Sequence, residues 1–196
     1  MMIFQLNKLR KLAFERRNVT RRTGNGGDIQ IEGLKIHFSC ASLQQIKKSH
    51  LLETMSDSYL SKNVVSIDQA TLFGELAILR YLEKDGWKGV WVDSNHSSKG
   101  KDVLWSGMPP KGLAPPLPPI VAEKFQAIKE QNGGKLAGFF DIFAWKGDGN
   151  DYLFIEYRGK DDDNSPNVNE LNWINAALAA GVRPDQLCIV GYDLPS

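Results

Sequence analysis

Two acidic residues stand inside strongly apolar stretches of this sequence, and both are candidates for chemistry. Asp141 interrupts residues 138–145, and Glu156 interrupts residues 152–157. An unpaired carboxylate in apolar surroundings is costly, so each needs a cationic partner, a metal ion or a place at the exposed end of a strand. The turn-forming stretch 146–151 between the two segments predicts a hairpin, which would bring the two carboxylates close together.

Two neighbouring carboxylates repel each other unless a cation lies between them. A hard divalent ion takes oxygen ligands and keeps several waters, so the pair is a candidate site for Mg²⁺ or Mn²⁺. Side chains alternate along a strand, so Glu156, Arg158 and Lys160 are expected on one face and Tyr157 on the other. Two cations would then lie beside the metal, where a phosphate would bind. The alternative is a structural hairpin in which Arg158 forms a salt bridge with one of the acids.

The order and spacing of these motifs resemble the PD-(D/E)XK nuclease superfamily, and within it the VRR-NUC group of nuclease domains. The resemblance covers about residues 70–192. The matching segments are the glycine-led entry 138–141, the Glu-x-Arg-Gly motif 156–159, the acidic loop 161–163, the helix residues Glu170 and Trp173, and the ending 181–190.

This resemblance implies a restriction-endonuclease-like α/β core, in which helices flank a mixed four-stranded sheet. It implies Mg²⁺- or Mn²⁺-dependent hydrolysis of phosphodiester bonds in nucleic acid, with DNA as the expected partner. Asp141 and Glu156 would bind the metal, and the Tyr157 carbonyl is a third candidate ligand. Glu75, on the preceding helix, would bind the metal directly or through water. Arg158 or Lys160 would stabilise the transition state.

The sequence departs from the family's pattern at three positions. Phe140 stands in place of a proline, Glu170 in place of a glutamine, and Arg158 in place of the lysine of the Glu-x-Lys motif. The family's lysine helps to position and activate the attacking water. Arginine stays protonated and cannot accept a proton, although it can bind a phosphate oxygen. Lys160, two residues further along the same face, is the candidate replacement.

Two alternatives remain. Because the lysine is missing, the same fold could be a non-catalytic module that binds nucleic acid or protein. The second alternative is an interaction protein in which the hairpin acids are purely structural, do not converge and have no cationic cleft around them. Members of the family that the sequence resembles often need a dimer or extra domains to act on both strands. The resemblance of this small chain therefore implies a homodimer or a larger nucleic-acid-processing complex.

Hydrophobic periodicity predicts the elements that position these residues. The strongest helix signal covers residues 68–84, with Asp68 or Thr71 as the N-cap and Gly86 at the end. A proline-rich extended connection is expected at 109–119. The other expected elements are strands at 29–38, 89–93, 138–145, 152–157 and 187–192, and helices at 42–60, 121–131 and 169–180.

The first 26 residues are strongly basic, with seven Lys or Arg residues against the single acid Glu15. We therefore divide the chain into a basic N-terminal extension, residues 1–26, and a nuclease-like domain, residues 27–196. The extension is expected to bind nucleic acid or to be a solvated, partly disordered tail. An organelle transit peptide is a third interpretation.

Cysteine usage and hydropathy limit the class of protein. Cys40 and Cys188 are the only cysteines and form no CxxC pair, which argues against a disulfide framework and a structural zinc site. No run of about 18 apolar residues is present, so no membrane span is expected. An intracellular, cytoplasmic location fits these features best.

Overall fold

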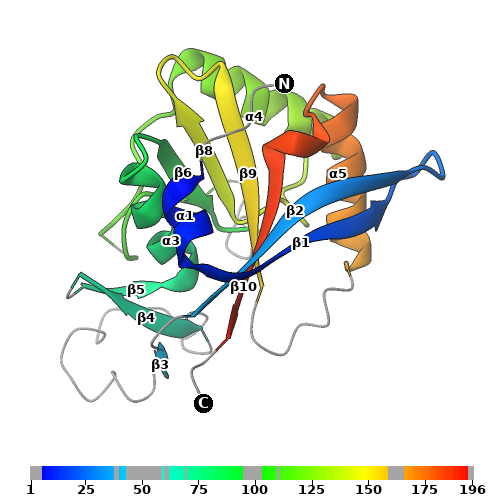
Figure 1. Cartoon of the computed structure of the whole chain (residues 1–196). Helices are drawn as coiled ribbons and strands as arrows, with labels where there is room; N and C mark the ends of the chain where they lie inside the picture. Colours follow the sequence, from blue (N-terminus) through cyan, green and yellow to red (C-terminus); the bar gives the residue numbers. More distant parts are fainter. Residues whose placement is uncertain are drawn as a thin grey trace.

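A mixed seven-stranded sheet forms the centre of the protein, with the strand order β1-β2-β10-β9-β8-β6-β7 (Figure 1). The computed structural model describes residues 6–37, 40–42, 59, 62–68, 70–94, 103–109, 111–158 and 166–193. The strands of the large sheet are β1 (Ala13–Arg22), β2 (Asp28–His37), β6 (Lys88–Val92), β7 (Leu104–Trp105), β8 (Ile142–Lys146), β9 (Asp151–Arg158) and β10 (Leu187–Asp193). A smaller sheet contains β3 (Cys40–Ser42), β4 (Asn63–Ile67) and β5 (Ala70–Phe73).

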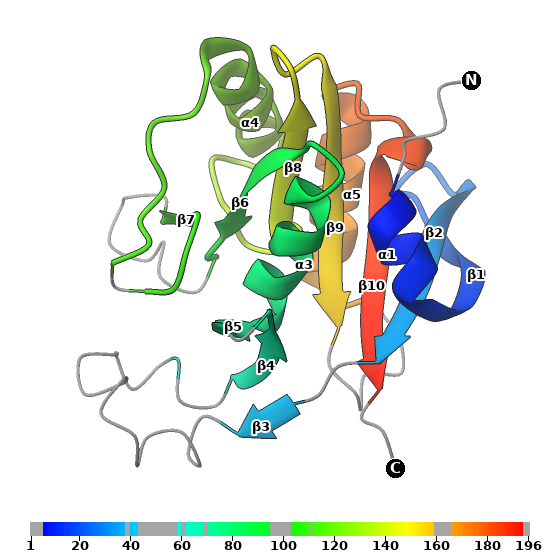
Figure 2. The same ribbon diagram turned by 60° about the vertical axis from the view of Figure 1, so that its left-hand side comes forward.

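Helices cover both faces of the large sheet (Figure 2). One face carries α1 (Asn7–Leu12) and α3 (Gly74–Glu83), and the other carries α4 (Pro119–Gln131) and α5 (Val168–Ala179). A short 3₁₀ helix, Pro184–Gln186, precedes β10. Because each face is covered, the central strands contribute side chains to two separate cores.

The alternation of side chains along β9 decides which core each residue enters. Leu153 and Ile155 pack in the core beneath α1 and α3, whereas Phe154 packs in the core beneath α4 and α5. Burial on both faces explains why β8 and β9 read as continuous apolar runs. Trp173 of α5 is fully buried and stacks on Phe140, with ring centroids 4.3 Å apart.

The expected α/β class, with a mixed sheet and flanking helices, is confirmed. Strand β8 pairs antiparallel with β6 and β9, and β10 pairs parallel with β9. The sheet has seven strands rather than the expected four because β2 and β1 extend it beyond β10, and β7 extends it beyond β6.

The helix predicted at 68–84 begins later than expected, at Gly74. Asp68 lies in the turn between β4 and β5 with a φ of 47°, and residues 70–73 pair antiparallel with β4. A tight hairpin with β4, the strand that directly precedes residues 70–73, therefore overrides the helical periodicity of Leu72. The predicted end is confirmed, because Gly86 has a φ of 82° and the Trp87 N–H donates to the Leu82 carbonyl.

The strand predicted at 138–145 also begins later, at Ile142, so Asp141 lies just before β8. Gly138 has a φ of 75°, and a Cβ atom there would overlap the Asn169 carbonyl at the start of α5. The glycine thus lets the chain pass against α5 and turn into β8. This contact explains the glycine-led entry in terms of packing.

The basic N-terminal segment is part of the sheet, and the prediction of a solvated tail is wrong for residues 7–22. Strand β1 pairs antiparallel with β2, from Ala13 opposite Ile36 to Arg22 opposite Asp28. Leu9 of α1 is fully buried beside α3. Burial of Leu9 and Val19 anchors a segment whose composition alone suggested disorder.

Most of the helix predicted at 42–60 lies outside the described residues. Within the described ranges, no helix is long and apolar enough to cross a membrane.

Candidate functional site

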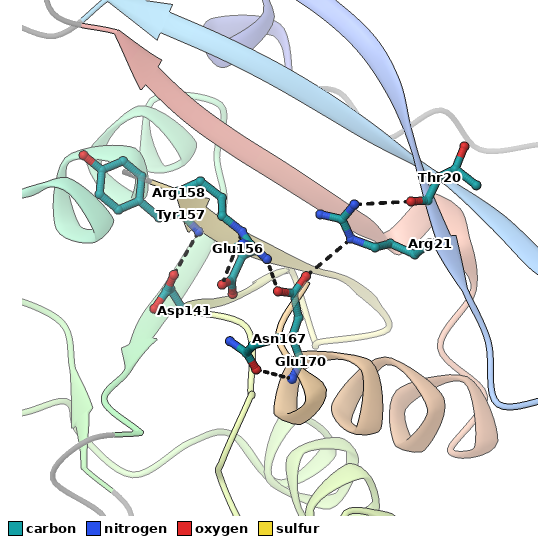
Figure 3. A network of polar contacts seen from close by, with 8 residues as sticks. All are labelled: Thr20, Arg21, Asp141, Glu156, Tyr157, Arg158, Asn167 and Glu170. Atoms are coloured by element: carbon teal, nitrogen blue, oxygen red, sulfur yellow. Dashed lines mark hydrogen bonds and ion pairs between the residues drawn. The ribbon is translucent and has the colours of Figure 1, made fainter. Parts of the chain in front are cut away.

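The two acids selected from the sequence lie at one end of the β8–β9 hairpin (Figure 3). Ile142 pairs with Ile155, so Asp141 precedes β8 at the level of Glu156. Glu156 turns toward Arg158, whose Nε is 3.8 Å from its Oε1. The expected adjacency in the hairpin is therefore present, although Asp141 stands outside the strand itself.

The Asp141 carboxylate lies at the edge where β8 and β9 stop pairing. Its Oδ2 accepts the Tyr157 backbone N–H at 2.9 Å, as a carbonyl of a continuing strand would. The Tyr157 ring packs at the start of α3, where a Cβ atom on Gly74 would overlap it. Gly74 thus allows the end of β9 to lie against the first turn of α3, which contains Glu75.

Glu75 is buried, with 4% of its surface exposed, and its Oε1 forms an ion pair with the Lys62 Nζ. Its negative charge acts on Asp141 and raises the pKa of that carboxyl. The acid that the structure couples electrostatically to Asp141 is therefore Glu75, on α3. Glu75 thus lies beside Asp141, and its expected role in metal binding stays a prediction.

Burial is the largest cause of the raised pKa of Asp141. Desolvation, followed by the charge of Glu75, raises its pKa from 3.8 to about 7. The Lys62 ammonium, the Tyr157 N–H and the Arg158 guanidinium act in the opposite direction. Asp141 therefore interacts with Glu75 and Lys62 beside α3 and also with Arg158, which points toward α5.

Lys62 is the functional candidate that the sequence did not reveal. Its ammonium contacts Glu75 and lies 4.9 Å from the centre of the Trp91 ring. Burial tends to lower its pKa, but Glu75, Asp141 and Asp93 together raise it, so the side chain stays protonated. No motif or spacing distinguishes Lys62, because its contacts depend on how β4, α3 and the β8–β9 hairpin pack together.

Asp93 is a further buried acid near this cluster, with 2% of its surface exposed. Its Oδ2 accepts the Tyr59 hydroxyl at 2.7 Å and the Trp105 Nε1–H at 3.1 Å. Its position directly after the apolar run of β6 was the signal that could have identified it, because the same logic selected Asp141.

Arg158 is buried and directed at α5 rather than at open solvent. Its Nη2 forms an ion pair with Oε2 of Glu170, and the Arg21 Nε lies 3.5 Å from Oε1 of the same carboxylate. The exposed fractions of these side chains are 6% for Arg158, 2% for Glu170 and 4% for Arg21. Glu170 is therefore a carboxylate shared by two buried guanidinium groups.

This triad of Arg21, Glu170 and Arg158 joins two positions at which the sequence differs from the motif that it resembles. Arg158 is buried, and Glu170 is the acid that neutralises it. The third member, Arg21, comes from the segment expected to be a separate extension. Asn167 also accepts the Glu170 backbone N–H at 2.9 Å, which caps α5 at the same point.

The remaining predicted cation, Lys160, lies outside the described residues, as does the acidic loop 161–163. The expected contacts of Lys160 with a phosphate and of the loop with a metal's waters stay predictions.

The donor set can be compared with what a divalent ion requires. Within the described ranges, no group of three or more His, Cys, Asp or Glu side chains is arranged to hold a metal. Mg²⁺, however, often uses only one or two carboxylates, with waters and substrate phosphates completing its shell. Asp141 and Glu75 already act on one cation, the Lys62 ammonium. Their oxygen donors fit a hard ion that keeps most of its waters.

Comparison of the chain with protein-family models, curated proteins and solved structures finds no match.

The acidity of Asp141 gives the first testable prediction. Carbon-13 NMR of the metal-free protein should show an aspartate carboxyl that titrates near pH 7 and is absent from Asp141→Asn. Glu75→Gln should lower this pKa because a like charge is removed, and Lys62→Met should raise it because a cation is removed. The folded form binds the extra proton, so this group's contribution to stability should fall as pH rises from about 4 to about 7. A carboxyl that titrates near pH 4 in all variants would contradict the described burial.

The buried triad gives a second prediction, on stability. Glu170→Leu leaves two buried guanidinium groups without their shared carboxylate and should cost about 3–5 kcal/mol in urea unfolding. Arg158→Met should cost less, because Arg21 still neutralises Glu170.

The matched control is Arg183→Met, which breaks an exposed pair with Asp185 and should cost at most about 1 kcal/mol. Equal costs for Glu170→Leu and Arg183→Met would show that the triad is not a buried charge network.

Proposed function

We propose that this chain is a metal-dependent nuclease that hydrolyses phosphodiester bonds in nucleic acid, on a restriction-endonuclease-like core. The observation that carries the proposal is the convergence of Asp141 and Glu75 on Lys62, at the end of the hairpin that bears Glu156. Asp141, Glu75 and Lys62 come from three separate segments and interact where β8 and β9 stop pairing, and Glu156 lies at the same level of β9 beside Arg158. Acids in such numbers are costly to bury and are typical of functional sites.

In this proposal Asp141 and Glu156 hold Mg²⁺ or Mn²⁺, with the Tyr157 carbonyl as a third candidate ligand. Glu75 binds the ion directly or through a water. When bound, the metal supplies an activated water and neutralises charge on the scissile phosphate. The Tyr157 N–H fixes one oxygen of Asp141, which limits the rotation of the carboxylate.

The contacts of Arg158 support a positioning role rather than direct contact with the phosphate. Its guanidinium is held by Glu170 from one side and approaches Glu156 at 3.8 Å. It can therefore orient Glu156 through charge. The cation that stabilises the transition state must then come from elsewhere, and Lys160, two residues further along the sequence, remains the candidate.

The partner in this proposal is nucleic acid, with DNA as the expected class. The segment 7–37 has eight Lys or Arg residues against three Asp or Glu, whereas the whole chain has a net charge of +1. Strand β1 is at the edge of the large sheet, and Arg16, Arg17 and Arg22 on it are exposed. A surface of this charge favours binding to phosphates. Cutting both strands of a duplex would require a second copy or a larger complex.

A non-catalytic nucleic-acid-binding module is the second candidate. The buried ion pair of Arg158 with Glu170 favours this module, because Arg158 stands where the resembled motif has its catalytic lysine. The basic edge strand serves such a module equally well, so a cleavage assay is needed to separate the two functions.

The nuclease proposal predicts metal-dependent cleavage. Single-stranded, duplex and branched DNA, and RNA, should be incubated with Mg²⁺ or Mn²⁺ and with EDTA. Asp141→Asn should lower the rate by roughly 10²–10³, by analogy with the loss of one preorganised catalytic group. Glu123→Gln, an exposed residue of α4, is the matched control and should leave the rate unchanged.

Two further variants identify the cation. If Lys160 contacts the transition state, Lys160→Ala should lower cleavage more than Arg158→Lys, which keeps a positive charge beside Glu156. Should wild type and Asp141→Asn be equally inactive on every substrate while both bind nucleic acid, the binding module replaces the nuclease.

The basic edge strand predicts the salt dependence of binding. Arg17→Gln with Arg22→Gln should reduce the slope of log affinity against log salt by about 1 for each phosphate that the protein no longer neutralises. These substitutions are preferable to deletion of the segment, because β1 is a strand of the sheet. Lys88→Gln with Lys111→Gln is the control of equal charge change, because both lysines are exposed and Lys88 is on β6, four strands away from β2 in the sheet order. An unchanged slope at low ionic strength in the β1 variant would exclude this edge as the binding surface.

A further inference from the structure

Lys62 has an unusual position for a lysine in a site proposed to bind a divalent cation. Its ammonium forms an ion pair with Glu75 and also interacts with Asp141 and Asp93. The side chain is 26% exposed, whereas Glu75 is 5% exposed. The cation is thus on the solvent side of a buried acid.

The surroundings of Lys62 hold it there by more than one contact. Its ammonium lies 4.9 Å from the centre of the Trp91 ring, a distance at which the ring face attracts a cation. Lys62 directly precedes β4, which pairs with the strand that leads into α3. The same small sheet therefore fixes the positions of the lysine and of its partner, Glu75.

An ammonium and a divalent ion compete for the same carboxylates. A cation already close to Glu75 and Asp141 lowers the electrostatic gain from a second cation and repels it. Without Lys62, the two acids would repel each other across a poorly solvated space. The metal-free fold therefore needs this ammonium, whereas the fold with a metal bound would not need it.

We infer that Lys62 is a built-in counter-ion that fills the place of the divalent ion in the metal-free protein, and that the ion must displace it to bind. The inference rests on the proposed metal site and adds how its affinity is set. Lys62 keeps the acids assembled before the metal arrives, and in return it weakens metal binding.

Divalent-ion affinity tests this inference without any measurement of cleavage. Mn²⁺ binding to the full chain should be measured by calorimetry and by electron paramagnetic resonance. Lys62→Met should bind Mn²⁺ at least about tenfold more tightly than wild type, because the competing charge is gone. Lys62→Arg keeps the charge and should stay within a few-fold of wild type. Lys84→Met removes a lysine from an exposed pair with Asp68 and should change nothing.

Thermal unfolding gives a second measurement of the replacement of Lys62 by a divalent ion. Metal-free Lys62→Met should unfold at a lower temperature than wild type, because Glu75 and Asp141 lose their cation. Millimolar Mg²⁺ should restore most of this loss, and it should stabilise wild type less. If the methionine variant does not fold, Lys62→Gln provides the same test with a polar side chain.

The outcomes separate this inference from the proposed function. If wild type binds Mn²⁺ and Lys62→Met binds it equally or more weakly, the counter-ion role is excluded and the metal site stands. If no variant binds Mn²⁺ or is stabilised by Mg²⁺, the metal site fails and the inference fails with it. Binding by Lys62→Met alone would support the inference in its strongest form.

Discussion

The hydrogen bond from the Tyr157 N–H to Asp141 is the interaction on which the candidate site depends. It ends the pairing of β8 with β9 with a side chain instead of a carbonyl, and so brings a carboxylate to the point where the two strands separate. On one side this carboxylate interacts with Glu75 and Lys62, and on the other with Arg158. A single acid thus connects two charged clusters that the sheet would otherwise keep apart.

The two clusters differ in how far their positive and negative charges are matched. Beside α3, burial and then the charge of Glu75 raise the pKa of Asp141, and Lys62 offsets them only in part. Toward α5, two arginines share Glu170 and one of them also approaches Glu156, so the charges are matched. Removing one member of a buried, matched network is far more costly than breaking an exposed pair. The α5 side therefore acts as a fixed support, whereas the α3 side is where we propose that a divalent ion binds.

The edge strand β1 contributes both to the buried charge network and to the basic surface. Its inward-facing Arg21 completes the buried network with Glu170, and its outward-facing arginines form a basic edge. Burial of Val19 and the pairing with β2 hold the strand in place. One segment consequently contributes to the support of the hairpin and to the surface proposed for nucleic acid.

The sequence by itself determined the elements whose signals are local. The β8–β9 hairpin, α4, α5, β6 and β10 were predicted nearly in place, because apolar periodicity and turn residues act over a few positions. The same logic selected Asp141, Glu156 and Glu75, since an acid in an apolar run is conspicuous. These patterns did not show which strands and which side chains pair. Only the tertiary structure converted the first turn of the helix predicted at 68–84 into β5, drew the basic segment into the sheet, directed Arg158 to Glu170 and brought Lys62 to Glu75. The β4–β5 and β1–β2 pairings join neighbouring segments, but helical periodicity and basic composition favoured other interpretations there. The ion pairs of Arg158 and Lys62 depend on the fold, which no local pattern encodes.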